Sequence, residues 1–332
     1  MSFVGPLDTL KSKNKIYNAD EIYKLSEKDI IPKLYDMYLA WGNKKIDGQT
    51  LFESFRVDDV DLLNFIKFSF NNFYFTYPNR LIKNYLKARY CIDKLQPDNI
   101  YTFEGNSMLF RCLLDVARNK KLKLEYLRFS IRQKLKNYYE FTLKQNAIYH
   151  FKKRLRDKRE RKYSYSNKRF DSEKKKILFV NFLSGNYIVS KRVIEYIRKQ
   201  GKYDVFLLNV DESKNENMIS YLERNKADFL QVEGFADTTF SWSFKYYVNK
   251  YNKIIKKFNS KREFHRFYFV GEEASNISRQ PFDFYFGSRK RYLDVIYYYL
   301  LFKVSIGKIK PDLVVLLDEF SDLAKPIYTH CK

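Results

Sequence analysis

ILFVNFL (residues 177–183) is an apolar run with one polar residue, Asn181; lysines precede it and the small polar triplet Ser184-Gly185-Asn186 follows it. No polar residues alternate with the aliphatic and aromatic ones until Asn181, so neither face of this segment is suited to water. Such a run is typical of a strand that is buried on both faces at the centre of a parallel sheet. Parallel strands need crossover connections, and the sequence on either side should supply them.

The segment after this strand predicts a helix that ends near Gly201, because glycine is common just beyond the carboxyl end of a helix. Apolar residues recur in the segment at the spacing of one helix face. We expect the following residues to face the sheet: Val189, Val193, Tyr196 and Ile197.

Strands and helices then alternate along the rest of the sequence. Strands are expected at residues 204–210, 228–232 and 312–318, and helices near residues 214–225, 246–258 and 292–302, with a last helix still running at Lys332. Alternation at this spacing is typical of parallel strands joined by crossover helices. Residues 174–332 are therefore expected to form an α/β fold, a Rossmann-like parallel sheet flanked by helices.

A shorter version of the same pattern occurs in the first half of the chain. A helix is predicted over residues 81–95, with Leu81, Tyr85, Ala88, Ile92 and Leu95 on one face. A strand should begin at Asn99, followed by a helix over residues 109–116 and a second strand over 121–127. This region is expected to be a helix-rich α/β unit with a short parallel sheet.

KLQPDNIYTFEGNS (94–107) and KIKPDLVVLLDEFS (308–321) share a Lys-x-x-Pro-Asp turn, a strand and an acidic residue after it. Pro-Asp before a strand is common, so chance or shared architecture explains the similarity. The similarity nevertheless favours two Rossmann-like halves over one.

The formal net charge is +24, and one segment carries more than a third of it. Residues 152–176 contain 13 Lys or Arg and four Asp or Glu, with no apolar spacing after Leu155. This pattern predicts a long basic helix that turns into a solvated linker. A positive excess also attracts polyanions, which include nucleic acid, anionic lipid and phosphorylated substrates. We therefore expect a helix-rich domain (1–150), a basic linker (151–176) and a truncated Rossmann-like domain (177–332).

Cysteine and histidine are too few and too scattered for a disulfide framework or a zinc site. The three cysteines are Cys91, Cys112 and Cys331, and the chain has three histidines. The amino-terminal residues lack the apolar core of a signal peptide, and no apolar run approaches the roughly 18 residues of a membrane span. We expect a cytoplasmic protein without a bound metal, in peripheral contact with the inner membrane face through residues 152–176.

Three places are candidates for a functional site, because ligands of an open parallel sheet bind beyond the carboxyl ends of its strands. Ser184-Gly185-Asn186 can offer backbone N–H groups to an anion or a sugar hydroxyl. Asp318 and Glu319 can act as a general base or bind hydroxyls, and so can Glu104, with Gly105 and Asn106 as neighbouring substrate contacts. Each place also has a purely structural interpretation, an ordinary turn for the first and helix capping for the carboxylates.

Other arrangements are disfavoured by the sequence. No G-x-G-x-x-G, P-loop or G-x-S-x-G motif is present. The acidic segment GEEAS (271–275) is interpreted as a solvated loop, with a loop that makes contacts as the less favoured alternative. RKYSYSNKRF (161–170) interleaves aromatic and basic residues, as proteins that bind single-stranded nucleic acid do. No motif of a known nucleic-acid-binding fold accompanies it, so nucleic acid is the less favoured partner.

Two segments resemble parts of one enzyme family. KKKILFVNFLSGNYIVSKRVIEYIRKQGKYDVFLLNVDES (174–213) resembles the opening of a GT-B glycosyltransferase, a group of two-Rossmann-domain enzymes that includes many surface-polysaccharide enzymes. IKPDLVVLLDEFSDLAKPIYTHCK (309–332) resembles a later strand-and-helix unit of the same amino-terminal domain. The resemblance covers residues 174–332 and lies in the pattern of the elements rather than in a motif.

The resemblance implies transfer of a sugar from a nucleotide-sugar donor to a glycan or lipid-linked acceptor, with no tightly bound cofactor or metal. It makes Glu104, Asp318 and Glu319 candidates for acceptor or base roles, and residues 184–186 candidates for acceptor contact. The carboxy-terminal domain, which holds most of the donor contacts in that family, has no counterpart in the sequence. Either residues 1–150 contribute a partner domain in an unusual order, or the chain is a fragment of a longer protein. We favour the fragment, which would lack the donor site and is not expected to be active alone. The alternative is a non-catalytic protein that binds a polyanion through residues 152–176.

Overall fold

The computed structural model shows two compact units, each described by itself below. Unit 1 comprises residues 1–44, 73–135 and 261–282, and unit 2 comprises residues 45–72, 136–260 and 283–332. The structure describes residues 43–62, 82–103, 108–127, 144–163, 165, 170, 172–182, 184–210, 217–269, 271–283, 286, 291–316 and 325–331.

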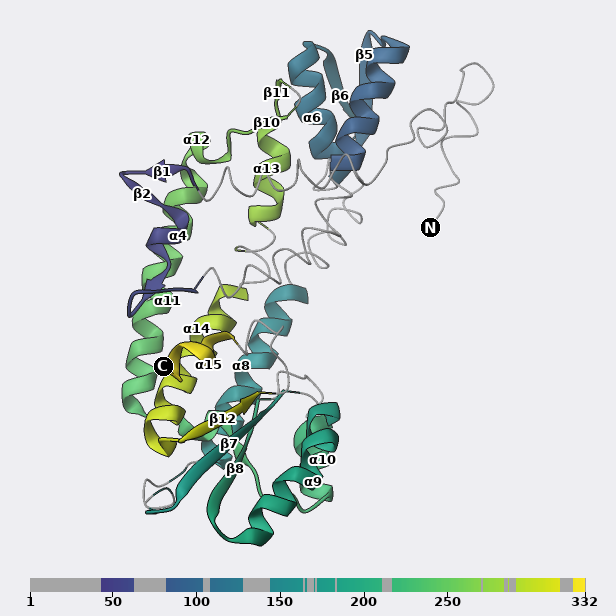
Figure 1. Ribbon diagram of the computed structural model, residues 1–332. Helices are drawn as coiled ribbons and strands as arrows, with labels where there is room; N and C mark the ends of the chain where they lie inside the picture. Colours follow the sequence, from purple (N-terminus) through teal and green to yellow (C-terminus); the bar gives the residue numbers. More distant parts are fainter. Residues whose placement is uncertain are drawn as a thin grey trace. The chain divides into compact units, whose positions relative to one another are not determined.

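Unit 2 contains the parallel sheet that the sequence predicts. Its strands are β7 (Lys175–Asn181), β8 (Tyr203–Asn209), β9 (Leu230–Gln231) and β12 (Leu313–Leu316). They are all parallel and lie in the order β12-β7-β8-β9, so the apolar run that begins at Ile177 is an inner strand (Figure 1). The predicted fold class, a parallel sheet flanked by helices, is confirmed.

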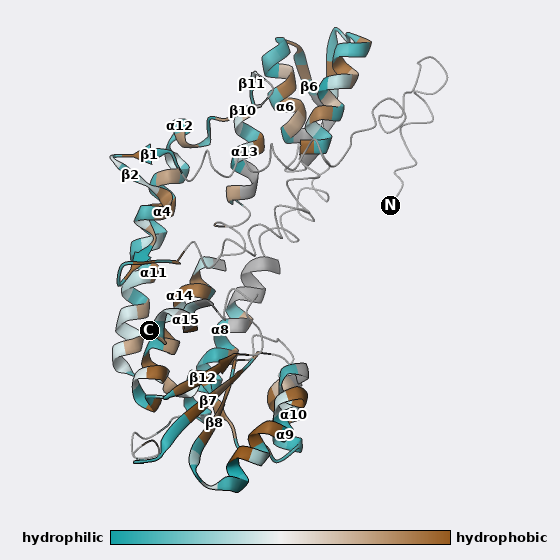
Figure 2. Ribbon diagram, in the orientation of Figure 1, coloured by the Kyte–Doolittle hydropathy of each residue, from teal (hydrophilic) through white to brown (hydrophobic). Residues whose placement is uncertain are grey.

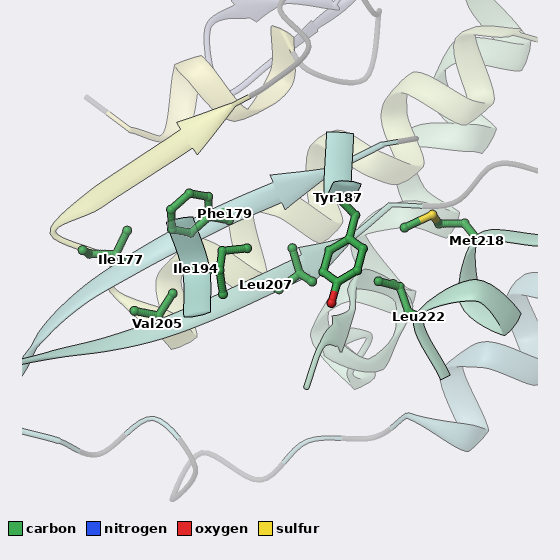
Figure 3. Close-up of a cluster of buried hydrophobic side chains, with 8 residues drawn as sticks. All are labelled: Ile177, Phe179, Tyr187, Ile194, Val205, Leu207, Met218 and Leu222. Carbon is green, nitrogen blue, oxygen red and sulfur yellow. The ribbon is translucent and has the colours of Figure 1, made fainter. Parts of the chain in front are cut away.

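Both faces of the sheet are covered, as the continuous apolar strands require. On one face, side chains of β7 and β8 pack under α9 (Ser184–Gln200) and α10 (Asn217–Arg224). Figure 3 shows this cluster, and Figure 2 shows β7 and β8 hydrophobic along most of their length. On the other face, Phe206 contacts Phe170 at a ring distance of 5.6 Å, and Phe170 stacks on Phe235. The sheet is therefore the middle layer of unit 2.

The prediction of which α9 side chains face the sheet is largely wrong. Val189, Val193 and Tyr196 are 72%, 50% and 64% exposed, and only Ile197 packs against the core. Tyr187, Ser190 and Ile194 are buried instead. The error has a physical reason, since α9 carries apolar residues on two faces and the spacing alone does not say which one meets the sheet.

The central helix of unit 2 is α14 (Arg291–Ile309), whose residues 292–302 are all buried. A helix that is apolar on every side must lie within a core. It packs against α11 (Thr238–Ser260), α15 (Lys325–His330) and the short 3₁₀ helix η4 (Val232–Phe235). The helices predicted at residues 246–258 and 292–302 are confirmed, and α15 ends at His330.

Two small hairpins in residues 45–61 also belong to unit 2. They are formed by β1 (Lys45–Ile46) with β2 (Gln49–Thr50), and by β3 (Arg56–Val57) with β4 (Val60–Asp61), and α4 (Leu51–Ser54) joins them. Phe55 lies between the hairpins and stacks on Tyr251 of α11 at 4.5 Å, while the Tyr251 hydroxyl donates to the Arg56 carbonyl. An aromatic stack therefore fixes this segment on α11.

Unit 1 contains the predicted strand–helix–strand unit. A helix at residues 82–95 precedes β5 (Asn99–Phe103), α6 (Met108–Lys120) and β6 (Lys123–Leu127). β5 and β6 pair in parallel, which confirms the short parallel sheet. On the first helix, Tyr85, Ala88 and Ile92 are buried as predicted, whereas Leu95 is exposed, and Leu81 lies outside the described residues.

A later segment of the chain completes unit 1. It contains α12 (Arg262–His265), the antiparallel pair β10 (Tyr268–Phe269) and β11 (Glu272–Glu273), and α13 (Ser275–Phe282). Glu272 accepts a hydrogen bond of 3.0 Å from the Tyr85 hydroxyl and lies 3.2 Å from Nε of Arg89. Asn119 donates to the Glu273 carbonyl. The interpretation of GEEAS as a solvated loop is therefore wrong, since its acids bind this segment to α6 and the helix before it.

Asp115 of α6 holds the start of α13. Its carboxylate accepts hydrogen bonds from Nδ2 of Asn276 at 2.8 Å and from the backbone N–H of Ile277 at 3.0 Å. The side chain is buried, and this burial raises the pKa of Asp115 to about 6 although the hydrogen bonds act in the opposite direction. A carboxyl group in this state titrates near neutral pH.

Within the described residues, no helix is both long enough and apolar enough to cross a membrane.

Asp115→Asn should remove a pH dependence of stability. The pKa of Asp115 rises from its ordinary value of 3.8 to about 6 in the folded chain, so the native state keeps a proton that the unfolded chain loses. The resulting stabilisation is complete below about pH 4 and is lost as the pH rises through about 6, with an upper limit of about 3 kcal/mol. Urea unfolding should show the wild type losing stability relative to the variant between about pH 4 and pH 7.5. A difference in stability between wild type and variant that is the same at both pH values would contradict a raised pKa for Asp115.

A buried polar ladder at the carboxyl edge of the sheet

Three amide side chains lie side by side where the strands of unit 2 end. Asn181, Asn209 and Gln231 are the last residues of β7, β8 and β9, and each is directly opposite the next in the parallel register. Nδ2 of Asn181 donates to Oδ1 of Asn209 at 3.2 Å, and Nδ2 of Asn209 donates to Oε1 of Gln231 at 2.7 Å. All three side chains are buried. We call this row the amide ladder.

The amide ladder ends on a buried ion pair. Nε2 of Gln231 donates to Oε2 of Glu233 in η4, and Nη1 of Arg159 donates to the other carboxylate oxygen at 3.3 Å. Both charged side chains are buried. Burial raises the pKa of Glu233, and the Arg159 guanidinium opposes this shift. The arginine therefore favours the ionised carboxylate, which can only accept hydrogen bonds.

An acceptor at one end fixes the direction of the whole row. Because the carboxylate of Glu233 accepts, Gln231 must donate to it, and each amide before Gln231 must then point the same way. The last free position is Oδ1 of Asn181, which is buried and has no hydrogen-bond partner among the described residues. The amide ladder therefore presents an acceptor at the carboxyl end of an inner strand, where ligands of parallel sheets bind.

Residues of the predicted basic linker take part in this arrangement. Arg156 and Arg159 belong to α8 (Lys144–Lys162) and are both buried. Arg156 lies 2.6 Å from Asp294 of α14, and its guanidinium carbon lies 4.4 Å from the ring centre of Tyr297. This part of the segment is thus not a solvated tether. Sequence spacing missed the buried face because arginines, rather than apolar residues, form it.

The chain just after α8 covers the ladder near Gly234. The Tyr165 hydroxyl accepts a hydrogen bond of 2.8 Å from the backbone N–H of Gln231. A Cβ atom at position 234 would lie only 1.8 Å from the Tyr163 carbonyl oxygen. Only glycine therefore permits this close approach of the two backbones.

The structure describes only one of the three predicted sites. Ser184, Gly185 and Asn186 form the first turn of α9, directly after β7, where N–H groups lack partners within the helix. Glu104, Gly105 and Asn106 lie outside the described residues, and so do Asp318 and Glu319. Sequence reasoning missed the amide ladder, although a polar residue ending each of two apolar strands, Asn181 and Asn209, was a visible signal.

The amide side chains of the ladder suit polar recognition. Within the described residues, no group of three or more His, Cys, Asp or Glu side chains could hold a metal ion. Neutral amides beside a single carboxylate–guanidinium pair suit hydrogen bonding to an uncharged polar group such as a hydroxyl.

Glu233→Gln should destabilise unit 2 by about 3 kcal/mol, because it leaves a buried arginine without its compensating charge. Glu223→Gln is the matched control, since Glu223 pairs with Lys162 at 2.8 Å on the surface. The control should cost less than about 1 kcal/mol. The denaturant midpoints of the two variants measure this difference in stability. Equal midpoints would show that the buried pair stabilises the fold no more than the surface pair does.

Comparisons with protein-family models, with curated proteins and with solved structures found no match to this chain.

Proposed function

We propose that this chain takes part in sugar transfer, with the carboxyl edge of its parallel sheet as the surface that meets the sugar. The observation that carries the proposal is the amide ladder, which ends in an acceptor, Oδ1 of Asn181, where β7 gives way to α9. A sugar hydroxyl is a donor of the size and polarity that such an acceptor needs. The reaction class comes from the resemblance of residues 174–332 to GT-B glycosyltransferases.

The surroundings of Asn181 support a site for a polyhydroxylated ligand. Ser184-Gly185-Asn186 opens α9 three residues after Asn181, and a helix N-terminus favours anions and hydroxyl oxygens. Asp318 and Glu319 follow β12 in the sequence, and β12 is hydrogen-bonded to β7. We propose one of these two carboxylates as the base that accepts the proton of an acceptor hydroxyl. Nucleotide sugar and glycan, or a lipid-linked glycan, are the proposed substrates.

Asn181→Leu tests the proposal, because leucine keeps the volume of the side chain and removes the acceptor. A panel of nucleotide sugars and oligosaccharides is titrated against the full chain, with saturation-transfer NMR and thermal shift as readouts. The variant should bind the ligand found with the wild type about tenfold more weakly. Asn225→Leu, at an exposed position near the end of α10, is the matched control and should bind as the wild type does. Equal binding by Asn181→Leu, or no binding of any panel member to the wild type, would contradict the proposal.

A second candidate function, binding of a polyanion, is favoured by the outer side of α8. Arg154, Lys158 and Arg161 are exposed there, while the buried arginines of the same helix are used in ion pairs. A charge-removal experiment must therefore spare Arg156 and Arg159, since their loss would remove the buried ion pairs with Asp294 and Glu233.

Replacing Arg154, Lys158 and Arg161 with Gln should weaken binding to single-stranded nucleic acid. If each base neutralises one phosphate, the slope of log affinity against log salt should become shallower by roughly 2 to 3. The matched control replaces three exposed lysines of α11, Lys245, Lys253 and Lys256. Fluorescence anisotropy across a salt series gives the slopes. Equal slopes for the two triple variants would mean that α8 is not the binding surface.

A further inference from the structure

The helix α9 presents apolar side chains to solvent. The residues Ile188, Val189, Val193 and Tyr196, which we call the outer face of α9, are all at least half exposed. The opposite side of the helix buries Tyr187 and Ile194 on the sheet (Figure 3), and Ser190 is buried as well. Because that contact fixes the rotation of the helix, the outer face cannot turn inward without breaking the core. Large aliphatic groups gathered in this way mark an interaction surface.

Two basic residues lie between Ile188 and the other three members of the outer face, and they border those three on one side. Arg192 and Lys199 are exposed, and at 100° per residue both fall within one quarter turn of Tyr196. The one acid in this part of the helix, Glu195, has its carboxylate 4.0 Å from Lys191, one turn earlier. The surface therefore combines apolar side chains with a positive border, and Figure 2 shows brown, hydrophobic turns on α9.

The kinds of side chain present narrow the choice of partner. Three of the four members, Ile188, Val189 and Val193, offer neither the flat ring on which bases or sugars stack nor a hydrogen-bonding group, and Tyr196 supplies a single ring. A second copy of this chain would bring a further +24 of charge to a border that is already positive. An anionic bilayer offers both complements, phosphate groups for the bases and acyl chains for the apolar side chains.

We infer that the outer face of α9 binds the surface of an anionic lipid bilayer. The helix lies on the bilayer with Val189, Val193 and Tyr196 at the boundary between headgroups and acyl chains. Arg192 and Lys199 meet the lipid phosphates. Because only about three turns of helix take part, attachment is reversible and needs both the apolar and the basic contribution. This role is independent of sugar transfer and of the exposed bases of α8.

Co-sedimentation with vesicles tests the inference. The wild type should pellet with vesicles of phosphatidylcholine mixed with phosphatidylglycerol, and should be released by high salt. A triple variant, Val189→Gln, Val193→Gln and Tyr196→Gln, should partition about tenfold less, because several methylene groups no longer leave water. All three positions are exposed, so folding is expected to survive, and circular dichroism verifies it.

The matched control is Trp242→Gln with Tyr246→Gln, an exposed aromatic pair one turn apart on α11. It should pellet as the wild type does, and so should the triple Gln variant of α8. The inference would be overturned if the α9 variant pelleted as the wild type does. It would also be overturned if the wild type bound pure phosphatidylcholine vesicles as strongly as anionic ones, or did not bind the anionic vesicles at all. Light scattering tests whether the outer face of α9 binds a second copy of the chain instead. If the wild type is a dimer and the α9 variant is a monomer, the face binds a second copy and the inference is wrong.

Discussion

Two buried guanidinium–carboxylate pairs hold the core of unit 2 together. Arg156 binds Asp294 of the central helix α14, and Arg159 binds Glu233 beside the end of β9. Charged groups enter a protein interior only when opposite charge and hydrogen bonds compensate their lost hydration. The helix α8 has few apolar residues to bury, so these pairs decide which of its sides faces inward. The position of Glu233, and with it the end of the amide ladder, depends on that choice.

The fold class could be predicted because the evidence for it is local. Two segments are continuously apolar, Ile177 to Val180 and Val205 to Leu208. A continuous apolar segment of this length is enough to predict a strand that is buried on both faces. The orientation of α9 could not be predicted, since its two apolar faces compete and only contact with the sheet decides between them. The same holds for α8, because a buried arginine and a solvated one look identical in a sequence.

The candidate site was only partly within reach of sequence reasoning. Ligands bind parallel sheets at the carboxyl ends of the strands, and this rule predicted a site at residues 184–186. These residues do begin α9 shortly after the end of β7. The amide ladder needed more, since Asn181, Asn209 and Gln231 become neighbours only once the strand order and register are known. Glu233 and Arg159 are further apart still, 74 positions along the chain. With no matching relative, function rests on this geometry and on the family resemblance.

The amide ladder also bears on how the strands find their correct alignment. Apolar strands fit against each other almost equally well at several offsets, because their side chains differ little in what they require. Hydrogen-bonding amides do not share this tolerance. A shift of β8 by one residue would move Asn209 to the opposite face and break both hydrogen bonds that it makes in the ladder, to Asn181 and to Gln231. Each mismatched offset would thus carry a penalty that apolar side chains alone could not impose, and the folding chain has a means of rejecting misaligned sheets.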